Sequence, residues 1–136
     1  MNNFFLSHEL QLEVNQICGI EDQITSHLSE HHICIESIST HAFKHGTFIY
    51  MVTSNNCLAS QLLKKLPVIK QVTENSVIFL EKKHWSNDLH LELSQALQRH
   101  HVHINHAYSA SANNKPYFVL STSNNHEAAQ LIAHSI

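Results

Sequence analysis

The chain has little charge, glycine or proline, and it contains no long apolar run. Asp, Glu, Lys and Arg make up 14% of its 136 residues, against a usual value of about 25%. With 8 basic and 11 acidic side chains and no basic cluster longer than a lysine pair, the chain lacks the positive patch that binds a polyanion, so we expect no nucleic-acid partner. No apolar run reaches the length of about 18 residues that a membrane helix needs, so we expect no membrane span.

Three further absences concern location and chemistry. The first residues have neither the basic start nor the apolar length of a signal peptide, so we expect a cytoplasmic protein. Cys18, Cys34 and Cys57 form no CxxC pair, which indicates neither a disulfide framework nor a thiolate zinc site. A chain with only two glycines has no GxGxxG, P-loop, GxSxG or HExxH motif. The sequence therefore predicts a protein that is not an enzyme and has no cofactor.

What the chain does contain is an internal duplication with a shift of about 69 residues. The run at 30–35 matches the run at 99–104, and Thr-Ser-Asn-Asn occurs at both 53–56 and 122–125. The apolar positions of the intervening segments follow the same shift. Because a unit of about 65 residues is marginal by itself, we expect the two copies to share a surface, and ligands often bind at such a seam.

The spacing of apolar residues predicts the same order of elements in both copies. Alternation predicts a strand at 10–14, and Ile20, Ile24 and Leu28, four residues apart, predict a helix over 20–30. A second helix should begin at the Ser-Asn-Asn cap of 54–56 and stop at Pro67. The remaining predicted strands are 33–38, 47–52, 68–72, 77–81, 102–109 and 117–121, and the remaining predicted helices are 88–99 and 126–134.

The second copy has no fourth strand after its last helix. This leaves an unpaired sheet edge, or a slot that another segment fills, and Phe4-Phe5-Leu6 is a candidate for that segment. An open edge needs to be covered, so we also expect a homodimer.

This order of elements predicts an α+β fold of two ferredoxin-like βαββαβ repeats. Each repeat should have an antiparallel sheet with its helices on one face, and the second repeat should lack its last strand. We expect the first repeat at 1–75, including an N-terminal extension at 1–8, and the second at 76–136. The fold alone does not define a function, because it carries metal, RNA and small-molecule sites alike.

Five stretches suggest a family. They are Cys18-Gly19 and His32-Ile33-Cys34-Ile35 in the first copy, and Asn87-Asp88, His101-Val102-His103-Ile104 and His106-Ala107-Tyr108-Ser109-Ala110 in the second. They resemble the turn, the Ile-Asn-Ile-like strand and the Tyr-Ala-Tyr-like run of the ACT domain, an amino-acid-sensing regulatory module. The chain is most similar to small stand-alone proteins built from two ACT repeats, although neither helix ends in the glycine of that family.

The resemblance implies a non-catalytic regulatory protein whose ligand, a free amino acid or a similar small molecule, lies at the seam between repeats. In ACT proteins the turn of one repeat commonly faces the second strand of another. By that resemblance Asn105 and Tyr108 would face the turn at Gly19. Strict alternation places these two residues on opposite faces of a strand, so both could face one site only if the strand contains a bulge.

The turn at Gly19 also has a physical logic of its own. A residue without Cβ permits an unusual backbone and a close ligand, and the helix start behind it presents N–H groups that attract a carboxylate. The acidic side chains of Glu21 and Asp22, beside Ile20, could then face the ammonium group of an amino acid. Alternatively, Gly19 only makes the turn and the two acids complement the helix dipole. At the second turn, Asn87 and Asp88 can replace structurally the Pro-Gly that commonly forms this turn in ACT repeats, since both residue types cap helices.

Two other functions compete with amino-acid binding. One is a pure protein–protein interaction module without a ligand. The other is a transition-metal site, because His100, His101, His103 and His106 lie within seven residues, and His31 or His32 could add a ligand. Since no cysteine or carboxylate completes a recognised metal spacing, we expect no specific metal site.

Overall fold

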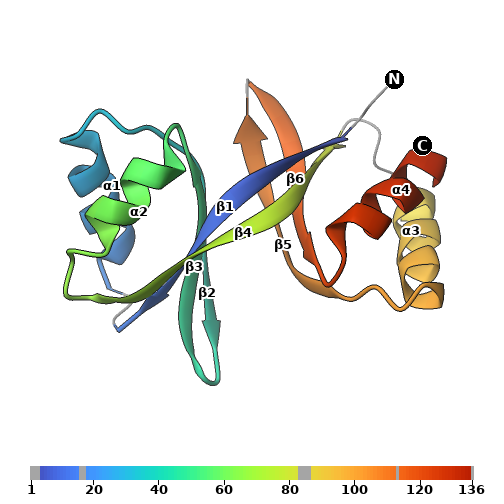
Figure 1. Ribbon diagram of the computed structural model, residues 1–136, viewed down its shortest axis with the longest axis horizontal. Coiled ribbons are helices and arrows are strands. Elements are labelled where there is room, and N and C mark those ends of the chain that lie inside the picture. Colours follow the sequence, from blue (N-terminus) through green and yellow to red (C-terminus); the bar gives the residue numbers. More distant parts are fainter. Residues whose placement is uncertain (1–3, 16–17, 83–86, 113, 136) are drawn as a thin grey trace. The chain divides into compact units, whose positions relative to one another are not determined.

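The computed structural model describes residues 4–15, 18–82, 87–112 and 114–135 (Figure 1). Among these residues the strands form one antiparallel sheet in the order β2-β3-β1-β4-β6-β5. The elements are β1 (Phe4–Val14), α1 (Ile20–Ser29), β2 (Ile35–Phe43), β3 (Gly46–Thr53), α2 (Asn56–Leu63), β4 (Ile69–Glu81), α3 (Asn87–Arg99), β5 (Ile104–Ala112), β6 (Lys115–Thr122) and α4 (Asn125–Ser135).

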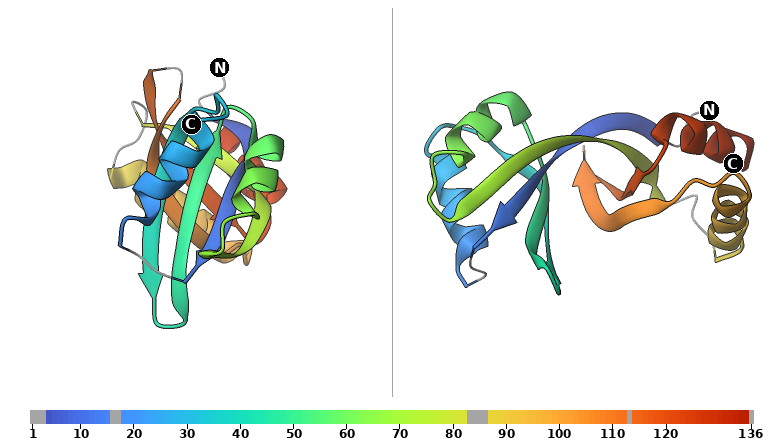
Figure 2. Two further views of the ribbon diagram at one scale, coloured as in Figure 1. Left: turned by 90° about the vertical axis from the view of Figure 1, so that its left-hand side faces the viewer. Right: turned by 60° about the horizontal axis from the view of Figure 1, so that its bottom comes forward.

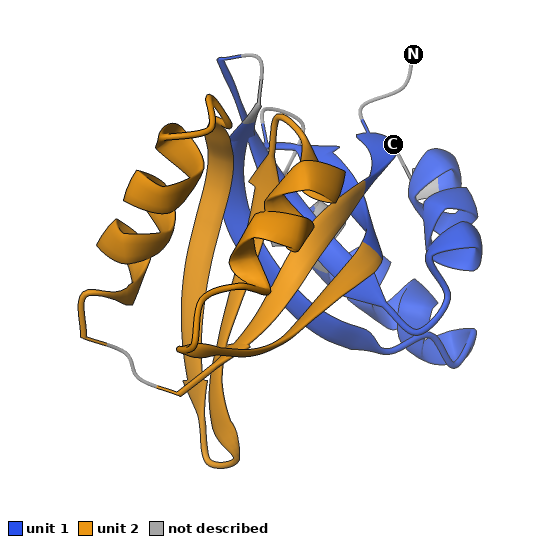
Figure 3. Ribbon diagram, turned by 60° about the vertical axis from the view of Figure 1, so that its left-hand side comes forward, with its two compact units in different colours: residues 1–7, 76–136 blue, residues 8–75 orange. Residues whose placement is uncertain are grey.

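The chain divides into two compact units, one of residues 8–75 and one of residues 1–7 with 76–136 (Figure 3). In the first, the strand order β2-β3-β1-β4 is that of a ferredoxin-like repeat. Its helices α1 and α2 lie on the same side of the strands (Figure 2). Apolar residues of β1 and β3 share one buried cluster with both helices: Leu10, Leu12, Ile49 and Met51 from the strands, and Ile20, Ile24, Leu28, Ala59, Leu62 and Leu63 from the helices.

The second unit has the same strand order because the N-terminal segment supplies its fourth strand. The order there is β1-β4-β6-β5, with residues 4–7 of β1 belonging to this unit beside β4. Phe4 packs against the apolar cluster of this unit. The ring of Phe5 stacks on Phe79, with centroids 4.9 Å apart, and meets the edge of Tyr117 at 5.4 Å.

The predicted α+β fold of ferredoxin-like repeats is confirmed, and so is Phe4-Phe5-Leu6 as the segment that fills the missing strand. One consequence concerns assembly. Since β1 occupies that edge, the edge no longer calls for a second copy of the chain. The homodimer stays a prediction, but the unpaired edge no longer supports it.

The number of strands also differs from the prediction, besides several strand ends. The sequence predicts two strands at 68–72 and 77–81, whereas the structure has a single strand, β4. The polar residues between them contain no glycine or proline that would end a strand. Instead, Asn75 Nδ2 donates to the carboxylate of Glu9 at 3.0 Å and to Gln11 Oε1 at 2.8 Å, both on β1. These side-chain hydrogen bonds link the middle of β4 to β1, and β4 continues through residues 73–76.

The first helix of each unit ends in the same unusual backbone. His32 and His101 have φ values of 59° and 57°, the left-handed conformation in which glycine is favoured. One residue later, Ile33 N donates to Leu28 O and Val102 N donates to Leu97 O, as in a Schellman motif. The duplicated histidines thus occupy the position where the ACT family has glycine.

We expect His32→Gly to raise the free energy of unfolding by about 1 kcal/mol, because glycine removes the strain of a side chain at positive φ and loses only part of that gain to unfolded-state entropy. Urea denaturation measures the change. Glu30→Gly, two residues earlier at φ −59°, is the matched control and should destabilise the protein. If His32→Gly also destabilises, the imidazole contributes a contact that outweighs the strain.

Candidate functional site

The turn before α1 has the backbone that the sequence predicts. Gly19 is the N-cap residue, with φ 73° and ψ 4°, and its carbonyl accepts the hydrogen bond from Gln23 N. No atom lies within 4 Å of the place where a Cβ would be. Backbone conformation rather than crowding therefore accounts for the glycine. The N–H groups of the first helical turn precede this first helical bond and have no partner within the helix.

A cavity of about 330 Å³ lies at this turn, lined by Gly19, Ile20, Glu21, Asp22 and Thr40. Four of these five residues are predicted site residues. The carboxylates of Glu21 and Asp22 belong to exposed side chains in the first turn of α1. Backbone N–H groups and two negative charges therefore share one small space, an arrangement that suits a ligand with both a carboxylate and an ammonium group.

Thr40 is the lining residue that sequence reasoning missed. It lies on β2, and its Oγ1 donates to Glu21 Oε1. The hydrogen bond holds the Glu21 side chain against the strand of the same repeat. The family resemblance predicts that a strand of the other copy faces the turn, and no local sequence pattern marks Thr40 as a site residue.

At the position that corresponds to Thr40, the second copy has Ser109 in a different setting. Lys82 Nζ donates to Ser109 Oγ at 2.8 Å and lies 4.7 Å from the ring centroid of Phe118. A cation therefore occupies the neighbourhood that an acidic side chain occupies in the first copy. Thr40 and Ser109 have the same strand register in the two repeats, but the first contacts an acidic side chain and the second a basic one.

The remaining predicted site residues lie in the unit of the second copy. Asn87 is the first residue of α3, and Asp88 is exposed in its first turn. Asn105 is exposed, and Tyr108 is buried. The register of β5 shifts between Ile104 and His106, so Asn105 lies in a β-bulge, which removes the objection from strict alternation. That Asn105 and Tyr108 face the Gly19 turn stays a prediction.

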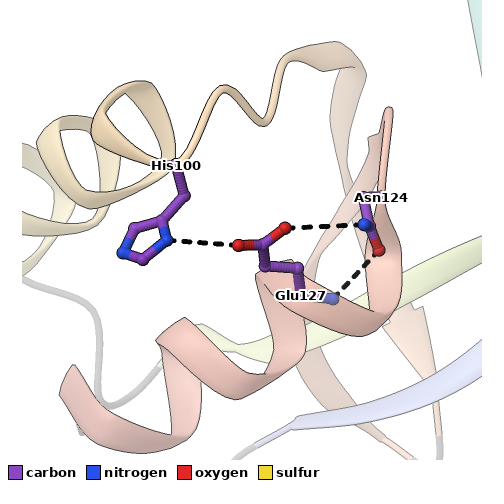
Figure 4. A network of polar contacts seen from close by, with 3 residues as sticks. All are labelled: His100, Asn124 and Glu127. Atoms are coloured by element: carbon purple, nitrogen blue, oxygen red, sulfur yellow. Dashed lines mark hydrogen bonds and ion pairs between the residues drawn. The ribbon is translucent and has the colours of Figure 1, made fainter.

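The histidines considered as an alternative metal site belong to no group of three or more His, Cys, Asp or Glu side chains that could hold a metal ion, among the residues that the structure describes. His100 instead contacts an acid. Its Nδ1 lies 3.1 Å from Glu127 Oε1, and Asn124 Nδ2 lies 3.5 Å from the other oxygen of that carboxylate (Figure 4). The contact joins the end of α3 to the start of α4.

A buried acidic side chain, Glu9, lies elsewhere in the unit of residues 8–75. No feature of the sequence predicts its burial. Glu9 is 0% exposed, and its carboxylate accepts a hydrogen bond from Asn75. Tyr50, on β3, is also buried. Burial, and secondly the charge of Glu9, raises the pKa of Tyr50 above its usual value. Neither Glu9 nor Tyr50 lines the cavity at Gly19.

The fold has clear relatives among solved structures, although no protein-family model and no curated protein matches the sequence. A protein from Bacteroides thetaiotaomicron is 16% identical, with a TM-score of 0.73 over 98% of this chain and 90% of that one. The regulatory subunit of aspartate kinase from Thermus flavus is 13% identical, with a TM-score of 0.67 over 98% and 97%.

A longer enzyme contains the same fold as one part. Escherichia coli aspartokinase III, in complex with aspartate and ADP, is 15% identical, with a TM-score of 0.63 over 98% of this chain and 33% of that one. At these identities the likeness shows the fold, which is that of the ACT-like repeats in aspartate kinase regulatory domains. None of the described helices has the length and apolar character that a bilayer crossing requires.

Proposed function

We propose that this chain is a non-catalytic regulatory protein of the ACT type that binds a free amino acid at the Gly19 turn. The observation that carries the proposal is the cavity of about 330 Å³ in which a left-handed glycine, a helix start and two carboxylates meet. The carboxylate of the amino acid would accept hydrogen bonds from the first N–H groups of α1. Its ammonium group would contact Glu21 and Asp22.

The structural neighbours support a regulatory function. Those described as regulatory subunits of aspartate kinase match this chain over nearly their whole length. By analogy, the protein would act in the cytoplasm, as a homodimer, by passing occupancy of the site to a partner. Occupancy can do so only if the ligand prefers one arrangement of the protein, since a ligand with equal affinity for two states shifts neither.

A thermal-shift screen against the twenty amino acids tests the proposal, because a ligand that binds only the folded state raises the melting temperature. We expect at least one amino acid to do so, with a dissociation constant that calorimetry then measures. Glu21→Gln should weaken that binding about tenfold or more, because it removes a charged hydrogen-bond acceptor. Glu36→Gln removes an exposed acid of β2 outside the cavity and should leave binding unchanged.

Gly19→Val is the sharper variant. A branched side chain at φ 73° strains the turn, so we expect the variant to lose amino-acid binding and about 1–2 kcal/mol of stability. Gly46→Val, at the other positive-φ glycine, controls for the stability loss and should keep binding. If no amino acid stabilises the wild type, the proposal fails and the interaction module without a ligand takes its place.

A further inference from the structure

A second cavity, of about 620 Å³, lies within the unit of residues 76–136 where α3 ends and β5 begins. Leu97 and Val102, both nearly fully buried, form part of its lining, together with Ile104. This volume lies within the range of about 300–1,000 Å³ that is typical of small-molecule sites. The cavity shares no lining residue with the one at Gly19.

The polar groups of this cavity differ from those at Gly19. Ser94, Gln98, His101 and His103 complete the lining, which contains no Asp, Glu, Lys or Arg among the residues that the structure describes. A permanently charged ligand would therefore lose its hydration without gaining a counter-charge. The lining instead offers apolar surface with a few hydrogen-bonding side chains, the usual composition of a site for a mainly apolar molecule.

The backbone around the cavity is already engaged. His101 N donates to Gln98 O at 3.1 Å, and Val102 N donates to Leu97 O at 2.8 Å. His103 N donates to Ser123 Oγ, and its carbonyl accepts from Ser123 N. These hydrogen bonds fix the backbone of the lining and use its N–H and C=O groups. A bound molecule would therefore make its polar contacts only with the few polar side chains.

The duplication shows that apolar surface is left open here. Ile35 and Ile104 occupy the same place in the two repeats, opposite Thr53 and Thr122 respectively. Ile35 packs against the core of its unit, whereas Ile104, which lines the cavity, is 45% exposed. Burying this exposed surface would favour binding.

From these observations we propose that the cavity binds an uncharged, mainly apolar small molecule, an aromatic or branched aliphatic compound with one or two hydrogen-bonding groups. The ligand class differs from the charged amino acid proposed at Gly19. The chain would then have two sites of different chemistry, one in each unit.

Titration with N-phenyl-1-naphthylamine, an uncharged fluorescent probe, tests this site. We expect saturable binding of one probe per chain, with increased fluorescence. Ile104→Asn removes the exposed apolar side chain of the lining and should weaken binding about tenfold. Gln98→Phe, at an exposed lining position, should block the cavity to a similar extent. Phe43→Asn is the matched control, since it removes a 50% exposed apolar side chain outside the cavity and should leave the affinity unchanged.

Three results would overturn the proposal. One is the absence of saturable probe binding, and the second is binding that both cavity variants leave intact. The third is a wild-type dimer that Ile104→Asn converts to a monomer in sedimentation, because a second copy would then cover the cavity. Gly19→Val should retain probe binding, so this site and the amino-acid site can fail independently.

Discussion

Removal of residues 1–7 is expected to unfold the unit that they form with 76–136 and to leave the unit of 8–75 folded. The deletion takes away a whole strand, the Phe4 ring that packs against the apolar cluster, and the Phe5 ring that stacks on Phe79. Truncation of a fully buried phenylalanine to alanine costs about 3–5 kcal/mol, and each of these rings contributes less, because Phe4 is partly buried and Phe5 is 39% exposed. Together with the hydrogen bonds of the lost strand, the two rings account for a large part of the stability of a small domain, about 5–15 kcal/mol.

Hydrogen exchange resolved by peptide measures this effect, because it reports on the two units separately. Peptides from β6 and α4 should lose protection in the deletion variant, while peptides from α1 and β3 should keep it. Phe4→Ala should produce a smaller loss in the same unit. Leu6→Ser, at a side chain that is 53% exposed, is the control. Equal loss of protection in both units would show that they unfold as one cooperative body.

Asn125→Ala is expected to cost about 2–3 kcal/mol, since this one side chain makes three hydrogen bonds. Its Oδ1 accepts from the backbone N and from Oγ1 of Thr122, and its Nδ2 donates to Ser76 O at 2.6 Å. The side chain thereby joins the end of β6 and the start of α4 to β4. Asn56 makes the same bonds in the other unit, to Thr53 and to His8 O, so Asn56→Ala should cost a similar amount.

The residue just before each of these asparagines provides the control. Asn55 Oδ1 accepts one hydrogen bond, from Leu58 N, and Asn124 Oδ1 accepts one from Glu127 N. Asn55→Ala removes only this helix cap and should cost about 1 kcal/mol. Urea denaturation measures all of these variants. Equal losses for Asn55→Ala and Asn56→Ala would show that the bond to the neighbouring strand adds no stability.

Local pattern was sufficient for the elements, because a helix or strand that buries one face must repeat its apolar residues with the matching period. Ile20, Ile24 and Leu28, which predict a helix, are the buried residues of α1. The joining of two predicted strands into β4 had no such signal. Polar residues at 73–76 are compatible with either a loop or a strand, and only their pairing with β1 distinguishes the two.

For the candidate site, too, the sequence predicts the residues that are neighbours in the chain but not those that come from a distant strand. Gly19 could be placed at the start of a helix, and Glu21 and Asp22 beside it, because all of these residues are neighbours in the chain. Thr40 could not be placed there, since it reaches the cavity from β2 through a hydrogen bond to Glu21. The bulge at Asn105 likewise depends on how β5 pairs with β6.

From the amino-acid order alone follow the duplication, the ferredoxin-like order of elements in each copy, and a glycine turn with acidic neighbours at the first helix. Those features depend on residues close together in the chain. The tertiary structure decided between the ways in which the last strand position of the second repeat could be filled, and it alone decided which side chain of β2 lines the cavity at Gly19 and that Ile104, unlike Ile35, is exposed. Each of these depends on the pairing of distant segments, whose free energy is a balance between buried surface and chain entropy that no local period records.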